Sequence, residues 1–280
     1  MRSCNTVSVI TQLLVSCSLL VLVSTTPRME QNTTKGYLKD IEPVDEDQSE
    51  GPSPRIVGGQ YAADGQFPHQ ISLYIFGDFT CGGSIISANY VVTAAHCVTS
   101  KPGSNYPAYY FTVRAGSSQL YSGGEYVRVA ETKVHPQYRS FVNDIALLRL
   151  GSKLTLCSRI KAIPLASAEP PSGSAVVISG FGRVRTNGEL STRLKYNTLR
   201  SISNAQCNRL VRGVASTTLC LSHTAGNGAC NGDSGGPGVY NGQLVGVSNY
   251  IVNGCGSTYP DGYAKVPSFR NWLRQNSDLP

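Results

Sequence analysis

The feature that most limits what this chain can fold into is a succession of short, mostly apolar runs separated by glycine-rich turns. After residue 55 such runs recur at short intervals, as is typical of an all-β sandwich or barrel. The 29 Gly and 15 Pro are spread without a period, which fits many turns between short strands. Strands are expected near residues 70–76, 84–86, 90–93, 111–115, 126–129, 145–150, 175–179, 194–199 and 244–248.

One helix is expected, close to the carboxyl end of the chain. Phe269, Trp272 and Leu273 recur with the i, i+3, i+4 spacing of a single helical face. Pro170 and Pro171 interrupt the series of strands, so a break between two halves is expected near residue 170. The pattern therefore favours two β units followed by a short helix.

The first 25 residues have the pattern of a secretory signal peptide. Arg2 gives a positive start, an apolar stretch covers residues 7–23, and small polar residues follow. An uncleaved membrane anchor is the alternative, but the stretch is short and polar residues interrupt it. We therefore expect residues 1–25 to be removed and the protein to be secreted to the extracellular space.

Residues 26–55 are expected to form an acidic propeptide. Carboxylates and prolines stand there among few apolar residues, so the segment cannot bury enough surface to fold alone. Asn32, followed by two threonines, is an acceptor site for N-glycosylation. The predicted folded domain is residues 56–280.

The chain has nine cysteines, and secretion would place them in an oxidising compartment in which disulfides form. Cys4 and Cys17 would leave with the signal peptide, so seven remain. Seven is an odd number, and at least one of them is therefore unpaired or bonded to another molecule.

The formal net charge of +7 hides an asymmetry between the two parts of the chain. Residues 1–55 hold five basic and seven acidic residues, which leaves a charge of +9 on the rest. Such a surface could favour acidic polymers or anionic membranes, or it could simply keep the protein soluble. Because no run of Lys and Arg appears, we favour solubility and expect neither nucleic acid nor membrane as a partner.

A histidine, an aspartate and a serine stand in three short segments of distinctive composition. His96 lies in Ala-Ala-His-Cys, Asp144 in Asn-Asp-Ile-Ala-Leu, and Ser234 in Gly-Asp-Ser-Gly-Gly-Pro. Taken singly, they read as a core histidine, a turn aspartate and an ordinary loop. Together they supply a nucleophile, a base that takes its proton, and a carboxylate that orients the base.

With these segments and Arg55-Ile56-Val57-Gly58-Gly59, the sequence resembles the trypsin/chymotrypsin family of serine proteases and is similar in texture to insect secreted members. The match extends from Ile56 to about Gln275. The resemblance implies an all-β fold of two perpendicular six-stranded antiparallel β-barrels, with the active site between them and a short helix at the carboxyl end.

The resemblance also implies the roles of the individual residues. His96 would be the general base, Asp144 its orienting group and Ser234 the nucleophile. The oxyanion hole would consist of the backbone N–H groups of Gly232 and Ser234, which can point at the developing charge because the turn is rich in glycine.

Activation by cleavage follows from the same resemblance. A protease that prefers Arg would cut after Arg55 and release Ile56 as a new amino terminus. If the new ammonium group is buried it needs a negative partner, and the family pattern offers Asp233 beside the nucleophile. Forming that pair would order the oxyanion loop, so the intact precursor should be nearly inactive.

The family pattern implies three disulfides and leaves one cysteine over. The implied pairs are Cys81–Cys97, Cys207–Cys220 and Cys230–Cys255. Cys157 would then be a buried thiol or form an intermolecular bond.

The segments that would line the substrate pocket depart from the best-known family members. Trypsin has an Asp six positions before the nucleophile, where this chain has Gly228. A carboxylate stands instead at Asp261, where trypsin and chymotrypsin have a Gly on the pocket wall. Asn249, Tyr250 and Ile251 replace the usual Ser-Trp-Gly strand. Asn249 thus stands where the family has a Ser bonded to the catalytic Asp, and its amide is expected to donate that bond.

Two specificities remain open for P1, the substrate residue before the cleaved bond. Asp261 inside the pocket would attract Lys or Arg, whereas a carboxylate satisfied by its neighbours would have no effect. The branched side chain of Ile251 should narrow the entrance and favour a broad preference of the elastase or chymotrypsin kind.

No metal and no cofactor are expected, since Ser117 stands at the first position of the trypsin calcium loop and only Glu125 lies within it. The expected partners are protein and peptide substrates, an activating trypsin-like protease and protein inhibitors of a monomeric enzyme.

The rival hypothesis is an inactive homologue that serves as a secreted binding or regulatory protein. We favour the enzyme because all three catalytic positions are kept, and digestion over cascade signalling because the spacer has no cysteine-rich module.

Overall fold

The computed structural model describes residues 56–280. The predicted signal peptide, the propeptide and Asn32 lie outside these residues.

The first half of the described chain folds into a closed antiparallel barrel. Its strands pair in the order β2-β3-β4-β9-β8-β7, and β7 pairs back with β2. Buried and half-buried residues alternate along β7, as expected for a strand with one face on the core. Val91, Val113 and Leu148 are fully buried inside the barrel. The strands are β2 (Gln70–Ile75), β3 (Asp78–Ile85), β4 (Tyr90–Thr93), β7 (Phe111–Ala115), β8 (Glu125–Val134) and β9 (Ala146–Leu150).

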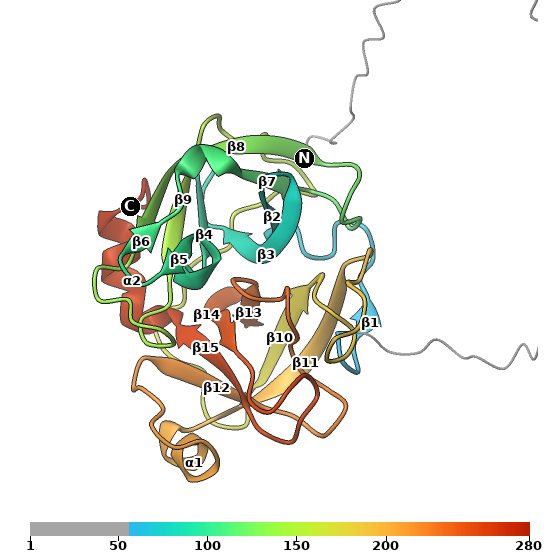
Figure 1. Cartoon of the computed structure of the whole chain (residues 1–280), viewed down its shortest axis with the longest axis vertical. Coiled ribbons are helices and arrows are strands. Elements are labelled where there is room, and N and C mark those ends of the chain that lie inside the picture. Colours follow the sequence, from blue (N-terminus) through green and yellow to red (C-terminus); the bar gives the residue numbers. More distant parts are fainter. Residues whose placement is uncertain (1–55) are drawn as a thin grey trace, which may run out of the picture. The chain divides into compact units, whose positions relative to one another are not determined.

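The second half forms another barrel of six strands. The order is β11-β10-β13-β14-β15-β12, and β12 closes the barrel by pairing with β11. A further short strand, β1 (Gln60–Tyr61), adds to the edge of β11. The strands are β10 (Ala175–Gly180), β11 (Lys195–Ile202), β12 (Thr218–Ser222), β13 (Pro237–Tyr240), β14 (Gln243–Tyr250) and β15 (Asp261–Lys265). Figure 1 shows the strands from β2 to β9 above and those from β10 to β15 below.

The prediction of two six-stranded antiparallel barrels is confirmed by this topology. The remaining elements are short. They are the 3₁₀ turns η1 (Ala95–Cys97) and η2 (Ala108–Tyr110), the hairpin of β5 (Thr99–Lys101) with β6 (Ser104–Asn105), and the helices α1 (Asn204–Leu210) and α2 (Val266–Gln275). The sequence analysis missed α1, although Ser203 and Gln206 form the reciprocal capping box that marks its start.

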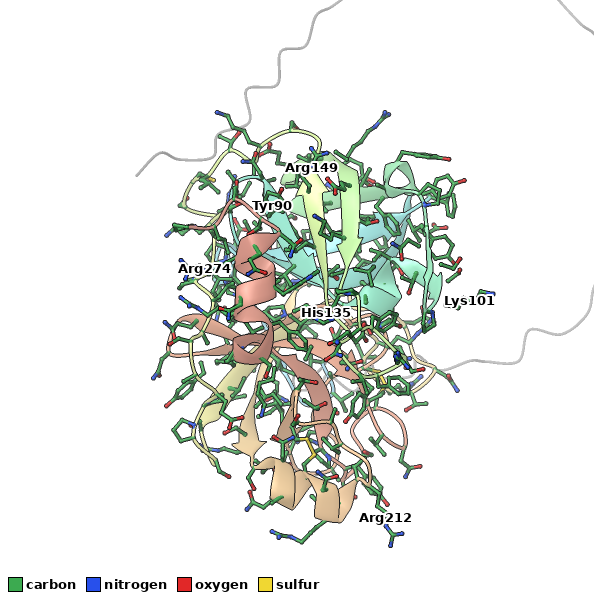
Figure 2. The ribbon with its side chains drawn as sticks, turned by 90° about the vertical axis from the view of Figure 1, so that its left-hand side faces the viewer. Tyr90, Lys101, His135, Arg149, Arg212 and Arg274 are labelled. Atoms are coloured by element: carbon green, nitrogen blue, oxygen red, sulfur yellow. A yellow bond between two sulfur atoms is a disulfide. The ribbon has the colours of Figure 1, made fainter. Side chains whose placement is uncertain are left out.

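The predicted carboxyl-terminal helix is α2, which packs onto the first barrel. Phe269 and Leu273 are buried in the same cluster as the core of that barrel. The rings of Phe269 and Trp272 lie 5.3 and 5.0 Å from the imidazole of His135, which follows β8 (Figure 2). The same cluster includes Leu244 and Val247 of β14, so the last helix packs where the core of the first barrel meets the second half of the chain. Within residues 56–280 no helix has the length and apolar character needed to span a bilayer.

Three disulfides join Cys81 to Cys97, Cys207 to Cys220 and Cys230 to Cys255. These are the pairs that the family resemblance implied. Cys157 is a correction, because it is disulfide-bonded and not a leftover thiol. Its side chain is half-buried, not buried as expected.

His69 is a buried histidine outside the sites discussed below. Its ring packs edge-on against Phe67, and its Nε2 has no hydrogen-bond partner among the described residues. Burial lowers the pKa of this imidazole from 6.5 to about 4, so it is neutral in the folded protein. The unfolded chain binds the proton more readily. The stability present above pH 6.5 is therefore lost as the pH falls towards about 4.

We expect the His69→Phe variant to lose less stability on acidification than the wild type. Between pH 7 and pH 4.5 the difference should be about 2 kcal/mol, because the variant has no neutral imidazole to protonate on unfolding. Urea unfolding at both pH values, in a Ser234→Ala background that prevents self-digestion, measures it. Equal losses in both proteins would contradict the assignment.

Candidate active site

His96 and Asp144 are held together by two hydrogen bonds. His96 lies in η1, which follows β4, and Asp144 lies just before β9. Oδ1 of Asp144 accepts from the backbone N–H of His96 at 2.9 Å, and Oδ2 lies 2.6 Å from Nδ1. Because the ionised carboxylate can only accept, the proton of a neutral imidazole sits on Nδ1 and Nε2 is free to act as a base. The Asp144 side chain is fully buried, whereas that of His96 is 34% exposed.

The turn that carries Ser234 packs against β3 and against the residues that precede His96. The N–H of Gly82 in β3 donates to the carbonyl of Ser234 at 2.8 Å. A Cβ at Gly235 would lie 2.1 Å from Oγ1 of Thr93 and 3.1 Å from the nitrogen of Ala94. Gly235 has φ +77°, so both its backbone conformation and its contacts require glycine. The structure thus places the serine turn against the segment that leads into His96.

Two backbone N–H groups at this turn are available as donors. The amides of Asp233, Gly235 and Gly236 all donate within the fold. The amides of Gly232 and Ser234 donate to no other described residue. This is the arrangement that an oxyanion hole needs, because its donors must be free when charge develops.

Asp233 is buried, and its carboxylate accepts two backbone hydrogen bonds. Oδ1 accepts from Gly182 at 2.8 Å and Oδ2 from Cys230 at 2.9 Å. Burial raises the pKa of this carboxyl from 3.8 to about 7, despite these two donors. The sequence analysis named Asp233 but missed the glycines that make room for it. A Cβ at Gly180 or Gly182 would lie 2.1 or 2.4 Å from its carboxyl atoms.

The segment that begins at Ile56 is seated against the second barrel. Ile56 is 1% exposed and belongs to the same apolar cluster as Ala229 and Tyr263. Val57 forms an antiparallel bridge with Gly228. The residue that would become the new terminus therefore lies deep in the fold, next to the segment that leads to the serine turn.

A cavity of about 220 Å³ opens beside Ser234. Of the residues expected at the substrate pocket, Asn249, Tyr250 and Ile251 line this cavity, whereas Gly228 and Asp261 do not. Its remaining lining residues are Phe141, Cys230, Asn231 and Ser248.

Asn249 makes a different hydrogen bond from the one expected. Its Nδ2 donates to the carbonyl of Phe141 at 2.8 Å, not to Asp144. Its Oδ1 is buried without a hydrogen-bond partner among the described residues. An Asn side chain is longer than a Ser side chain, and it reaches the backbone of the segment before Asp144.

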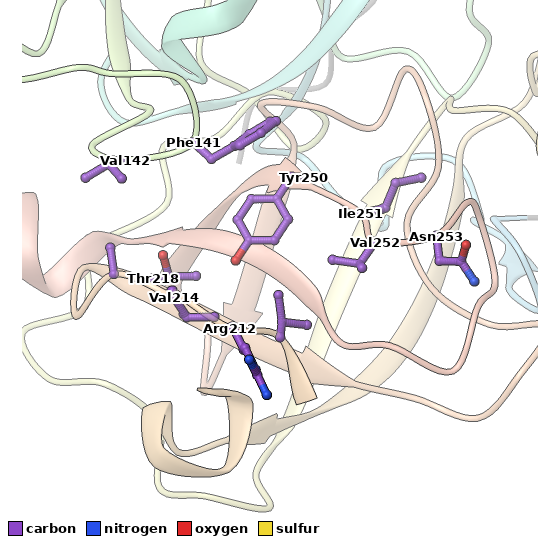
Figure 3. A pocket seen from close by; sticks show the side chains of 12 residues that line it. Phe141, Val142, Arg212, Val214, Thr218, Tyr250, Ile251, Val252 and Asn253 are labelled. Carbon is purple, nitrogen blue, oxygen red and sulfur yellow. The ribbon is translucent and has the colours of Figure 1, made fainter. Parts of the chain in front are cut away.

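A second cavity, of about 390 Å³, shares Phe141, Tyr250 and Ile251 with the first (Figure 3). The Phe141 and Tyr250 rings meet edge to face at 5.3 Å. The residues after α1, at 211–215, line its other side. The two cavities together make a cleft along the end of β14.

The carboxylate of Asp261 is buried beside a histidine that the sequence analysis did not single out. Nε2 of His223 lies 3.3 Å from Oδ1 of Asp261, and the two side chains are 2% and 4% exposed. Oδ2 accepts from the N–H of Ala229 at 2.7 Å. Burial alone would lower the pKa of His223, but the adjacent carboxylate of Asp261 outweighs it and the pKa is raised. His223 stands in no recognisable motif, so no sequence signal marked it.

One group of potential metal ligands occurs within residues 56–280, namely Cys81, His96 and Cys97. The two sulfurs are bonded to each other, and His96 is held by Asp144. This group is therefore not built as a metal site.

Comparison with known proteins gives a consistent result. The family model Trypsin matches residues 56–273. Serine protease SP24D of Anopheles gambiae is 46% identical over 220 residues, which cover 79% of this chain and 80% of that protein. Trypsin alpha-4 of Lucilia cuprina is 41% identical over 224 residues, covering 78% of this chain and 86% of its own length. The structure titled neuropsin, a serine protease expressed in the limbic system of mouse brain, matches with a TM-score of 0.71 at 28% identity, covering 78% of this chain and 97% of that one.

A protein with these two closed barrels and this family match is a serine endopeptidase. The chain belongs to the trypsin family, as the resemblance read from its sequence implied.

We expect the Gly182→Ala variant to lose most of its activity, because the new methyl group would displace Asp233 and with it the serine turn. Loss of one oxyanion donor alone costs about 10²- to 10³-fold in kcat, so a loss of at least about 10²-fold is expected. It is measured after cleavage at Arg55, with active-site titration to count competent molecules.

Gly238→Ala in β13 is the matched control. A Cβ there would meet no atom closer than 3.4 Å, and the variant should keep wild-type activity. Equal activity of the Gly182 and Gly238 variants would show that the space at Gly182 for the Asp233 carboxylate is not needed for activity.

Proposed function

We propose that this protein is a secreted serine endopeptidase zymogen, activated by cleavage after Arg55, that hydrolyses peptide bonds through an acyl-enzyme on Ser234. The observation that carries the proposal is the 2.6 Å contact between His96 and the buried Asp144, packed against a serine turn with two free N–H groups.

In the proposed mechanism His96 takes the proton of the Ser234 hydroxyl as the oxygen attacks the substrate carbonyl. Asp144 keeps the imidazole in the tautomer that leaves Nε2 free and stabilises the imidazolium that forms. The amides of Gly232 and Ser234 donate to the oxyanion. His96 then returns the proton to the leaving amine, and water releases the acyl group by the same steps in reverse.

The state of Asp233 supports the proposed activation. Among the described residues no ion pair includes this buried carboxylate, and its pKa lies near 7. A cation placed beside it would favour the ionised form and lower that pKa. The ammonium group freed by cleavage before Ile56 would be such a cation, because Ile56 is already seated in the core of the second barrel. In this proposal Asp233 is the group that senses cleavage.

The proposed processing divides the chain into a signal peptide (1–25), an acidic propeptide (26–55) and the protease domain (56–280). The partners in this scheme are protein substrates, an activating protease that cuts after Arg, and protein inhibitors of a monomeric enzyme. Extracellular digestion is the proposed setting.

The geometry of the cavity favours uncharged P1 residues. Its lining, from Cys230 and Asn231 to Ile251, carries no charged side chain, and Asp261 lies outside it. Ile251 lines both cavities, and its branched side chain takes up space that a Gly would leave open. The second cavity, which Val142, Val211, Val214 and Val252 line together with Arg212, would take a residue upstream of P1.

Cleavage of the purified precursor with trypsin should release Ile56 as the new terminus and raise peptidase activity by orders of magnitude. Ser234→Ala and His96→Ala should lower kcat/KM at least about 10⁴-fold, since the triad acts as a unit. Amino-terminal sequencing and labelling by a radioactive organophosphate, which needs an activated serine, are the measurements.

An Arg55→Gln precursor is the matched control and should stay inactive under the same treatment. If the wild-type chain shows Ile56 as its terminus and takes up no label, the protein is an inactive homologue and the proposed function is wrong.

A further inference from the structure

We propose that His223 is a specificity-determining residue: as an imidazolium it neutralises Asp261 behind the substrate cavity and so disfavours Lys and Arg at P1. The inference rests on the proposed function, because it assigns a charge state to the substrate pocket of the same enzyme.

Both ring nitrogens of His223 face groups that can only accept hydrogen bonds. Nδ1 lies 3.2 Å from the carbonyl oxygen of Thr224, and Nε2 lies 3.3 Å from a carboxylate oxygen of Asp261. A neutral imidazole has one N–H, so it would turn a lone pair towards one of these oxygens. With a proton on each nitrogen the ring is an imidazolium, and it then attracts the Asp261 carboxylate as an ion pair, although the geometry at Nε2 is not that of a hydrogen bond. The raised pKa of His223 agrees with this charge state, although burial also raises the pKa of Asp261 against the effects of His223 and Ala229.

The pair occupies the place where a side chain on the pocket floor would be. A Cβ on Gly228 would lie 2.7 Å from Oδ2 of Asp261 and 2.8 Å from Nε2 of His223. The absence of a side chain at Gly228 is therefore what makes room for the pair. A floor residue that could carry its own charge has been replaced by two residues whose charges cancel.

The carboxylate lies immediately behind two walls of the 220 Å³ cavity. Oδ2 of Asp261 accepts from Ala229, whose neighbour Cys230 lines the cavity. On the other side, Gly262 pairs with Tyr250, which also lines it. A net charge on Asp261 would therefore act on a P1 side chain across a single layer of backbone in a poorly solvated region, where Coulomb interactions are strong.

Other charged groups near the pair do not replace His223 in this role. Arg200 lines, together with His223, a separate cavity of about 340 Å³, so it faces the other side of the imidazole. Burial, with a smaller contribution from the charge of Asp261, raises the pKa of Asp233 and raises that of Tyr263 well above 10. Tyr263 therefore stays neutral, and Asp233 acts through the serine turn on all substrates alike.

The charge state makes specificity depend on pH. Below the pKa of His223 the pair is neutral, and a basic P1 residue gains nothing from Asp261. As the pH rises through that pKa the imidazole loses a proton, and the carboxylate is left uncompensated. The ratio of kcat/KM for a P1 Arg peptide to that for a P1 Leu peptide should then rise.

The test measures this ratio between pH 6 and pH 9 for the cleaved wild type and the His223→Gln variant. The two peptides share all other residues and the leaving group, so pH effects on the steps common to both substrates cancel in the ratio. Gln can still donate an N–H to Asp261 but carries no charge. We expect its ratio to be at least tenfold above that of the wild type at pH 6 and to change little with pH.

Two further variants complete the design. Asp261→Asn combined with His223→Gln removes the unmasked charge and should return the ratio to the wild-type value at pH 6. His135→Gln, on a histidine that packs against α2 instead, should leave the ratio and its pH dependence unchanged.

A His223→Gln enzyme that cleaves the Leu peptide normally but keeps the wild-type ratio at every pH would overturn the inference and leave the proposed function intact. If the cleaved chain hydrolyses neither peptide, the proposed function fails, and binding of benzamidine, an aryl cation, decides the matter separately. Calorimetry should then show binding to His223→Gln at least tenfold tighter than to the wild type. Equal binding would overturn the role of His223.

Discussion

The site depends on how three carboxylates, those of Asp144, Asp233 and Asp261, are satisfied out of contact with water. Each of these residues is buried, and an ionised carboxylate at such a depth is unstable without hydrogen-bond donors or a cation. Asp144 accepts two hydrogen bonds from His96, and these bonds hold the catalytic base in place. The two barrels matter because only a closed core on both sides can keep these groups dry.

The three buried carboxylates are stabilised in different ways, and the way each is stabilised determines what it can do. Asp144 has a permanent partner and is fixed. Asp233 has only two backbone donors, and its pKa near 7 shows that they do not fully offset burial. Asp261 has one backbone donor and a histidine, whose charge depends on pH. A fixed group suits orientation, an incompletely satisfied group suits a switch, and a titratable pair suits control of specificity.

Much of the fold and the serine turn could be predicted from the sequence, because period-2 runs and glycine-rich turns are local signals. The rest could not, since it depends on contacts between distant segments. Gly182 matters only because Asp233 packs against it, and Asn249 bonds the backbone at Phe141 because its side chain is longer than that of Ser. The capping box of α1 was a readable signal that the strand-based interpretation passed over. The odd number of cysteines after the signal peptide did not reveal that Cys157 forms a disulfide.

Asp261 shows why a charged residue at a pocket position does not by itself define specificity. Its carboxylate is on the segment that the family resemblance placed at the pocket, yet it faces His223 and the amide of Ala229. Charge in a pocket is a property of the whole buried cluster, because each group's pKa depends on the others. A fold that places a compensated pair behind its pocket can give that region a net charge by altering one residue. The backbone of the catalytic turn would stay as it is, since neither member of the pair belongs to it.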